Sequence, residues 1–599
     1  MPVPRSEYPR PQFVRPDWLC LNGEWEFEID SGDSGKERGL LTCSLKDRII
    51  VPFCPESTLS GVGNVDFMHA VWYRRTVMIP DAWAGKTVLL HFGAVDHDAT
   101  VWVNGVEVGR HRGGFTPFTC DLKGIAAPGE TAAIVLRARD GSTEPQARGK
   151  QSAQYGNHGC VYTRTTGIWQ TVWMEPVPQA SIRRPRITPD LANNTIRLEQ
   201  PITGALRGVR LRACLKDGSG VVATAECAAD LDAAPRLDLV IPAERRRLWS
   251  ASDPHLYDLQ IELIDGMGGV LDSASSYAGL RSVAVDGKAI KINGEPIFQR
   301  LVLDQGYYPD GILTAPTDEA LIADITLSQA AGFNGARLHQ KVFEERFLYH
   351  ADRLGYLVWG EFADWGCGGF GPGHDHQKPG ATYVTQWLEA LERDYSHPSI
   401  IGWCPLNETH QVITDRITVL DDVTRAMFLA AKAMDTTRPA LDTSGYAHRV
   451  READVYDSHD YVGGDFWNEV PRFEDRHRSA SGWKPFVNGD PNHPMSISYQ
   501  GQPYFVSEFG GIWWDPDAAE GKGGGWGYGS NPTSVDDFYK RFQTLCDTLL
   551  DNNQMFGYCY TQLTDVFQEQ NGIFTFTRRS KFDLNRIHAI QTRKAAIEQ

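Results

Sequence analysis

Apolar and polar residues alternate along the first part of the chain, from Leu21 to about Pro178. The alternation is clearest in five short segments that Asn-Gly, Gly-Gly and Pro-Gly pairs punctuate: WEFEI, KTVLLHFGAV, ATVWVNGVEV, AAIVLRAR and IWQTVWMEP. A period of two residues places one face of a strand in a core, and these glycine pairs favour tight turns. The pattern predicts a β-sandwich over residues 1–178.

A second, shorter stretch of alternating segments follows, up to about Gly279. Its candidate strands are TIRLEQPI, VRLRACLK, RLDLVIP and LYDLQIELID. Their number and spacing are typical of an immunoglobulin-like β-sandwich, so we expect a second β domain over residues 179–284.

The hydrophobic period changes after about Val285. Short apolar segments such as IIGWCPLNE and PYFVSEFGG now alternate with helical patterns such as DEALIADITLSQAAG. About eight strand and helix units in roughly 310 residues have the length and rhythm of a (β/α)₈ TIM barrel. We therefore predict a multidomain protein whose residues 285–599 form the barrel.

Composition narrows the classes of partner. The net charge is −17, without a basic block, which argues against nucleic acids and anionic lipids. No apolar run reaches the roughly 18 residues that a membrane span needs. The start lacks an export pattern, so the cytoplasm is the expected compartment. The 11 Cys include no CxxC pair, which argues against a disulfide framework or a thiolate zinc site. We expect a neutral substrate and no cofactor. The oligomeric state stays open, and a homo-oligomer is one of the alternatives.

Two glutamates stand at the ends of predicted barrel strands. Glu408 follows the fourth strand and Glu508 ends the seventh. Both should face the barrel mouth, where glycoside hydrolysis could use one carboxyl group as the acid and the other as nucleophile or base. The acid needs a raised pKa, which we expect Trp403 and Leu406 to provide. The alternative is that each Glu is an ion-paired strand terminus.

Several segments along the chain match a known family in sequence and in order. They are LNGEWEF, VWVNG, GGFTPF, TTGIWQTVWMEP, LWSASDPHLYDL and GLRSVAVDGKAIKINGEPI. The chain resembles glycoside hydrolase family 2, the β-galactosidase and β-glucuronidase group, from Leu21 to near the C-terminus. The resemblance implies a sugar-binding jelly roll, an immunoglobulin-like domain and a TIM barrel. It also implies that Glu408 is the acid/base, Glu508 the nucleophile and Asn407 a partner of the sugar 2-hydroxyl. The family is retaining, so the carboxyl groups should lie about 5 Å apart.

Other strand ends carry further candidates for substrate binding. The resemblance selects Arg337, His339, His459 and Tyr461, with Arg337 expected to pair with the nucleophile. Position alone selects Asp304, Glu361, Trp365 and Trp513 or Trp514. Ion pairing or core packing is the alternative for each of these residues. The sequence His374-Asp375-His376 suggests a metal site, but three adjacent residues do not easily converge on one ion, so we predict no metal.

Three positions depart from the family pattern and bear on the sugar. Glucuronidases of the family carry an Asn-x-Lys element that grips the substrate carboxylate, and here Glu569 and Asn571 occupy it. Val161 replaces an Asp of the bacterial β-galactosidases, and Gln562 stands where a Trp is common. The carboxylate of Glu569 would repel the carboxylate of a uronic acid, and the lysine that would pair with it is absent. Both changes disfavour a uronic acid as substrate. We expect a β-galactosidase-like, retaining exo-glycosidase for a neutral sugar. Alternatives are β-glucuronidase or galacturonidase, arabinosidase or β-mannosidase specificity, or a non-catalytic carbohydrate-binding protein.

Overall fold

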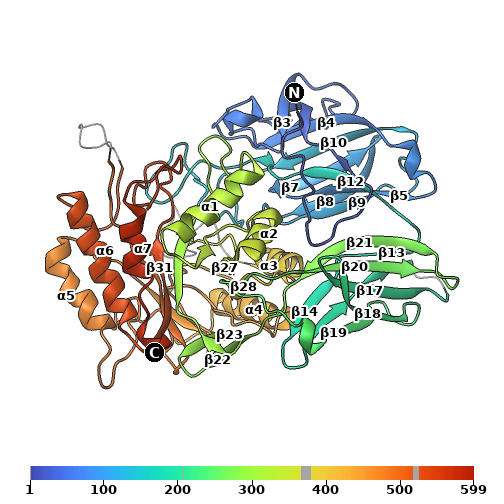
Figure 1. Ribbon diagram of the computed structural model, residues 1–599. Helices are drawn as coiled ribbons and strands as arrows, with labels where there is room; N and C mark the ends of the chain where they lie inside the picture. Colours follow the sequence, from blue (N-terminus) through green and yellow to red (C-terminus); the bar gives the residue numbers. More distant parts are fainter. Residues whose placement is uncertain (1, 205–206, 366–379, 517–524) are drawn as a thin grey trace.

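The computed structural model describes residues 2–204, 207–365, 380–516 and 525–599. Two groups of antiparallel sheets come first in the chain, and a parallel sheet surrounded by helices follows them (Figure 1). This order confirms the predicted fold class of two β-sandwiches and a TIM barrel. The proposed limits at residues 178 and 284 stay a prediction.

The N-terminal β-sandwich consists of a six-stranded and a four-stranded sheet. In spatial order the larger sheet contains β3 (Asp47–Val51), β2 (Gly23–Ile29), β4 (Ala70–Met78), β10 (Thr131–Arg139), β7 (Asp98–Val103) and β8 (Val106–Arg112). The smaller sheet contains β1 (Leu19–Cys20), β12 (Val172–Val177), β5 (Thr87–Phe92) and β9 (Phe118–Asp121). β6 (Val95–Asp96) and β11 (Gly167–Ile168) form a short pair beside them.

The central strand β4 is absent from the strands that we predicted. Trp72 and Tyr73 are adjacent residues of β4 and point to opposite faces of the sheet, yet both side chains are fully buried. Tyr73 lies in the main core of the domain, whereas Trp72 packs with Leu40 and Trp102 on the outer face. Because a second small core covers that face, the strand does not alternate between apolar and polar residues.

The Asn-Gly pair between β7 and β8 forms the tight turn that the sequence predicted. Asn104 and Gly105 connect the strands, with φ angles of 52° and 81°. Two consecutive left-handed residues define the tight turn that Asn-Gly adopts most readily.

The second β-sandwich packs a three-stranded sheet against a four-stranded one. The first contains β14 (Arg186–Asp190), β15 (Thr195–Glu199) and β19 (Arg236–Val240), and the second contains β18 (Gly220–Ala228), β17 (Arg210–Asp217), β20 (Tyr257–Ile264) and β21 (Val270–Ala278). β13 (Ser181–Ile182) and β16 (Ile202–Thr203) form a small pair. A three-stranded sheet of β22 (Val283–Asp286), β23 (Ala289–Ile292) and β24 (Glu295–Pro296) leads to the barrel.

The barrel is a seven-stranded parallel sheet among the described residues. Its spatial order is β28 (Ile400–Cys404), β27 (Leu357–Glu361), β26 (Gly335–Leu338), β25 (Gln299–Asp304), β31 (Met555–Thr561), β30 (Tyr504–Gly510) and β29 (Tyr456–Asp460). The covering helices are α1 (Asp318–Ala330), α2 (Glu345–Leu354), α3 (Ala381–Asp394), α4 (Val419–Met434), α5 (Phe466–His477), α6 (Val535–Leu550) and α7 (Leu584–Gln591).

The segment PALDTS, residues 439–444, occupies the place of a fifth barrel strand between β28 and β29. Parallel bridges join Trp403 to Ala440 and Asn407 to Ser444. On its other side the backbone N–H of Asp454, just before β29, donates to the carbonyl of Ala440. These few bonds close the barrel, so Glu408 and Glu508 belong to the fourth and seventh strand positions, as predicted.

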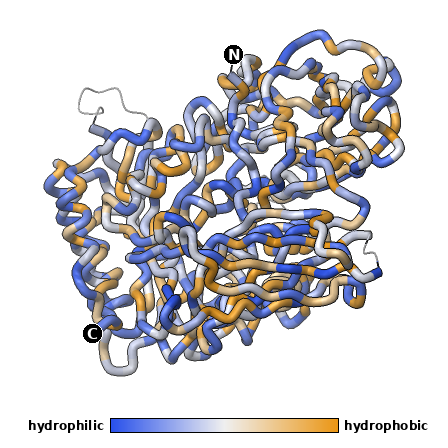
Figure 2. The backbone as a smooth tube through the Cα atoms, turned by 45° about the vertical axis from the view of Figure 1, so that its right-hand side comes forward, coloured by the Kyte–Doolittle hydropathy of each residue, from blue (hydrophilic) through white to orange (hydrophobic). Residues whose placement is uncertain are grey.

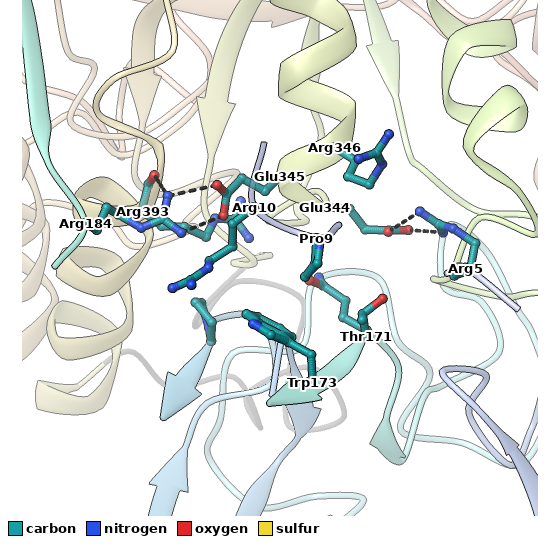
Figure 3. A pocket seen from close by; sticks show the side chains of 13 residues that line it. Arg5, Pro9, Arg10, Thr171, Trp173, Arg184, Glu344, Glu345, Arg346 and Arg393 are labelled. Carbon is teal, nitrogen blue, oxygen red and sulfur yellow. Dashed lines mark hydrogen bonds and ion pairs between the residues drawn. The ribbon is translucent and has the colours of Figure 1, made fainter. Parts of the chain in front are cut away.

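Ion pairs join the β domains to the start of α2. Arg5 contacts Glu344 at 2.8 Å, and Arg184 contacts Glu345 at 2.8 Å (Figure 3). A cavity of about 30 Å³ lies among these groups. It contains none of the predicted site residues, so we regard it as a packing feature of the domain junction.

Hydrophobic and hydrophilic segments are interleaved along the whole tube of Figure 2. Within the described residues, no helix combines the length and the apolar character that crossing a bilayer requires.

Candidate active site

The two predicted catalytic carboxylates lie together at the mouth of the barrel. Glu508 is part of β30, and Glu408 follows the end of β28 in a left-handed conformation with φ 48°. One oxygen of each carboxylate and one ring nitrogen of His459 all lie within 4.8 Å of one another. This spacing agrees with the roughly 5 Å separation of retaining glycosidases.

Glu508 is held by three side chains: Arg337 and His339, in and directly after β26, and Tyr461, directly after β29. The hydroxyl of Tyr461 donates to its Oε2 at 2.7 Å, and Nη1 of Arg337 lies 3.3 Å from its Oε1. Nε2 of His339 lies 3.8 Å from the same oxygen. The ring of Tyr461 is fixed in turn by stacking on Tyr528, with centroids 3.6 Å apart. These contacts orient the carboxylate.

Arg337 is fully buried and connects several site residues. It donates to Oε2 of Glu361 at 2.8 Å, to Oδ1 of Asn407 at 2.9 Å and to the carbonyl of Ser507 at 2.8 Å. Burial alone would lower the pKa of Arg337, but the charges of Glu361 and Glu508 raise it well above its ordinary value. The guanidinium of Arg337 is therefore a permanent cation between the carboxylates of Glu361 and Glu508.

Glu361 lies behind Arg337 and is also buried. Its Oε1 accepts from the backbone N–H of Gln340 at 3.0 Å and lies 3.1 Å from Nδ1 of His339. Burial raises the pKa of Glu361, but Arg337 and His339 outweigh it and lower the pKa to about 2. Because both oxygens are occupied, we assign Glu361 to positioning Arg337, not to the substrate contact that we predicted.

Asn407 places an amide group beside Glu408. Its backbone N–H donates to Oδ2 of Asp364 at 3.0 Å, and its Oδ1 accepts from Arg337. Its Nδ2 is buried and has no hydrogen-bond partner among the described residues. An amide fixed at one end with an open N–H is suited to a sugar hydroxyl.

The prediction of a raised pKa for Glu408 is wrong for this structure. Its Oε1 lies 2.7 Å from Nδ1 of His459, and its Oε2 accepts from Nε1 of Trp365 at 2.8 Å. Burial raises the pKa of Glu408, but these two donors outweigh it and hold the pKa below the ordinary 4.5. Trp403 faces the core instead, where its Nε1 donates to Asp435.

Opposite pKa shifts favour a proton on His459 over one on Glu408. Burial lowers the pKa of His459, but the charges of Glu508 and Glu408 outweigh burial and raise the pKa above 6.5. Its Nε2 lies 3.0 Å from Oγ of Ser444. The three groups also have the donor types of a metal site, but the bond from Nδ1 to Glu408 occupies the nitrogen that an ion would need. We interpret the trio as a proton-sharing site.

Asp304 is buried at the end of β25, apart from this trio. Its Oδ1 accepts from the backbone N–H of Gly306 at 2.9 Å. Burial and the nearby charge of Asp324 raise the pKa of Asp304 to about 7. Its described contacts do not join it to either catalytic candidate.

The residues that replace the Asn-x-Lys element form a buried chain. Gln562 donates to Oδ1 of Asn571 at 2.7 Å, and Asn571 donates to Oε1 of Glu569 at 3.2 Å. The other oxygen of Glu569 accepts from the hydroxyl of Tyr162. Both oxygens of Glu569 are therefore engaged within the protein.

The tryptophan candidates have different places. Trp365 contacts Glu408, as described above. Trp513 follows β30 and is partly buried, and its Nε1 has no hydrogen-bond partner in the described part of the chain. Trp514 packs against the barrel core. The sequence His374-Asp375-His376 lies outside the described residues.

Lys150 is a charged residue near the site that we did not predict from the sequence. Lys150 belongs to residues 140–166, which connect β10 to β11 of the N-terminal sandwich. It is only 6% exposed, and its Nζ lies 5.8 Å from the ring centroids of Tyr162 and Trp365. The available signal was the length of this connection, because long loops in compact domains are often functional.

Comparisons with known proteins agree with this architecture. The family model described as the sugar binding domain of glycosyl hydrolases family 2 matches residues 62–146, and a second model of glycosyl hydrolases family 2 matches residues 180–281. Two separate segments of the chain are therefore similar to glycosyl hydrolases family 2.

The similar proteins carry two kinds of name. A β-glucuronidase of Paenibacillus borealis is 26% identical over 70% of this chain and 72% of its own length. A β-galactosidase of Thermoanaerobacter pseudethanolicus is 24% identical over 66% of this chain and 51% of its own length. The β-glucuronidase structures of Lactobacillus rhamnosus and Ruminococcus gnavus have TM-scores of 0.76 and 0.75. They are 20% and 19% identical, cover 98% of this chain and are themselves covered over 98% and 100%. These two likenesses show the fold.

Proposed function

We propose that this protein is a retaining exo-β-glycosidase, with Glu508 as the nucleophile and Glu408 as the acid/base. The carboxylate pair supports this proposal, because its oxygens lie within 4.8 Å and the two groups have different partners. Glu508 contacts Arg337 and Tyr461, which orient its carboxylate. Glu408 shares a proton with His459, and an acid/base group must both donate and accept a proton.

In the first step, an oxygen of Glu508 attacks the anomeric carbon of the terminal sugar. The bond from this carbon to the leaving oxygen breaks with its electron pair, and the proton of the Glu408 and His459 pair moves through Glu408 to that oxygen. In the second step, Glu408 takes a proton from water, whose oxygen displaces Glu508 from the sugar. Two inversions leave the configuration unchanged.

Asn407 has the geometry to strengthen both steps. Its Oδ1 is fixed by Arg337, so its open Nδ2 can donate to the 2-hydroxyl of the sugar. Hydrogen bonds at this hydroxyl tighten in the oxocarbenium-like transition state.

The sugar has two candidate classes. The β-galactosidase-like interpretation follows from Glu569, which would repel a uronic acid. The uronidase interpretation follows from relatives named β-glucuronidase and from the buried cation Lys150 beside the site.

The roles of the two carboxylates can be tested by substitution. A panel of nitrophenyl glycosides first identifies a substrate. Glu508→Gln should then lower kcat/KM on every substrate by about 10³-fold or more, because no nucleophile remains. Glu408→Gln should cost less on activated aryl glycosides, whose leaving groups need little protonation. Glu469→Gln is the matched control, because Glu469 follows Asn468 in a second Asn-Glu pair that is partly exposed on α5.

Azide separates the two roles further. With Glu408→Ala, azide should restore turnover and give a glycosyl azide of retained configuration. A retained product from the Glu508 variant alone would reverse our assignment. Sugar binding by a folded protein that hydrolyses none of the panel would instead support the non-catalytic alternative.

A further inference from the structure

Residues 140–166 of the N-terminal sandwich reach the mouth of the barrel. The backbone N–H of Gly149 donates to the carbonyl of Ala363, just beyond β27, at 2.9 Å. Gly149 has a φ of +57°, and a Cβ there would lie 2.1 Å from the carbonyl oxygen of Gln340. Only glycine permits this close approach, which presses the next residue, Lys150, against the site.

The same segment also contacts the loops after the seventh and eighth barrel strands. Trp526 donates to the carbonyl of Gly159 at 3.0 Å, and Gln568 donates to the same carbonyl at 2.8 Å. Tyr162 donates to Glu569, as described above. Lys150 is therefore anchored from both sides by contacts between the two domains.

The ammonium of Lys150 has no partner in the described part of the chain. No hydrogen bond or ion pair of its Nζ occurs among the described residues, although only 6% of the residue is exposed. Its neighbours are the rings of Trp365 and Tyr162, which stabilise a cation but accept no ordinary hydrogen bond. Lysine is almost never this buried without a paired group.

The charges around Lys150 keep it protonated. Burial lowers its pKa, but Glu569, Glu508 and Glu408 outweigh burial and raise the pKa above 10.5. Glu569 lies within the range of this attraction, yet its own oxygens bind Tyr162 and Asn571. Trp365 lies under the ammonium and donates to Glu408, so the cation is one side chain away from the proposed acid/base.

We propose that Lys150 binds a carboxylate of the substrate, so that the terminal sugar is a uronic acid. The inference rests on the retaining mechanism proposed above and assigns the specificity to a residue outside the barrel. Glu569 then has a different role from the one that the sequence suggested, because it anchors Tyr162 and the connecting segment. The cation absent from the segment at residues 569–571 is supplied by the N-terminal domain.

The test compares matched substrate pairs: the 4-nitrophenyl β-D-glucuronide with the glucoside, and the galacturonide with the galactoside. The unmodified protein should prefer at least one uronide by about tenfold or more in kcat/KM. Lys150→Met keeps the apolar stem and should lower uronide kcat/KM by about a hundredfold, while neutral glycosides change by less than about threefold. Lys150→Arg should recover part of the uronide activity. Lys123→Met, at an exposed lysine of the same domain, is the control.

Neutral glycosides report whether each variant is folded. An unmodified protein that turns over a neutral glycoside at least as well as its uronide would overturn the inference and leave the proposed function intact. An equal loss on both members of a pair with Lys150→Met would also overturn it.

If the unmodified protein hydrolyses no member of the panel, the proposed function fails and binding decides the role of Lys150. Calorimetric titration with D-glucuronate and D-galacturonate should then show binding that Lys150→Met abolishes, with D-glucose and D-galactose as controls. No uronate binding by the unmodified protein would overturn the inference.

Discussion

Replacing His459 by glutamine tests the proton-sharing pair directly. The new amide would keep a donor near Glu408 but could not carry the positive charge. The removed charge lies 2.7 Å from Oε1 of Glu408 and 3.4 Å from Oε2 of Glu508, with Arg337 opposing it. A buried hydrogen bond between charged groups is worth about 1.5–3 kcal/mol, so the barrel should lose about 2 kcal/mol.

This loss should depend on pH in a defined way. The pKa of His459 is raised above 6.5, so its contribution to stability is complete below pH 6.5 and disappears as the pH rises through the folded pKa. The pKa of Glu408 is lowered below 4.5, so its contribution is complete above pH 4.5 and disappears as the pH falls through the folded pKa. Both contributions are complete between pH 4.5 and 6.5.

Thermal unfolding measures this prediction. At about pH 5.5 the variant should unfold about 3 °C below the unmodified protein, and at about pH 9 the difference should shrink. His493→Gln is the control, because His493 forms an exposed pair with Asp490 at 2.9 Å. An equal difference in Tm at both pH values would refute the charge argument.

The pH dependence of kcat/KM measures the same proton in catalysis. In the unmodified protein the alkaline limb should follow the loss of the proton from His459, above pH 6.5. In His459→Gln the proton must reside on Glu408 alone, so the limb should move to lower pH. An unchanged limb would mean that another group supplies the proton.

Two further substitutions probe the support of the site. Arg337→Met leaves the buried carboxylate of Glu361 without its cation, so thermal unfolding should show a loss of about 3–5 kcal/mol, with activity lost on every glycoside. Asn407→Ala removes the open Nδ2, so kcat/KM should fall by about a hundredfold on a glycoside with a 2-hydroxyl and little on its 2-deoxy analogue.

The controls for these two variants use exposed positions. Arg472→Met removes an exposed pair with Glu469 on α5 and should leave stability and activity nearly unchanged. Unchanged stability of Arg337→Met would contradict the role of the Arg337 and Glu361 pair. An equal loss on the 2-hydroxy and 2-deoxy substrates would contradict the contact of Asn407 with the 2-hydroxyl.

Local patterns determined much of the fold. The alternating segments of the two sandwiches and the strand and helix rhythm of the barrel are confirmed, because each depends on a periodicity that a short segment carries by itself. β4 was missed because the outer face of Trp72 is covered by Leu40 and Trp102, residues far away in the sequence. Burial on both faces removes the period on which the prediction depends.

The pairing of Glu408 with Glu508 could be predicted, because every strand end of a parallel barrel meets at the same mouth. The protonation state of Glu408 could not. It depends on His459 and Trp365, which approach from other strands at distances of 2.7 and 2.8 Å. A pKa follows from the positions of charges and donors in space, and here these donors outweigh burial, which by itself raises the pKa of Glu408.

The sequence by itself determined the domain types, the order of the strands and the two carboxylates, because these follow from local periodicity and from the geometry of a parallel barrel. Only the tertiary structure placed Lys150 beside them. This residue is more than 250 positions before Glu408, and it reaches the site because Gly149 lets its segment dock closely on the barrel. Electrostatic interactions act through space, so the charge balance of the site depended on a contact between domains that no sequence segment contains.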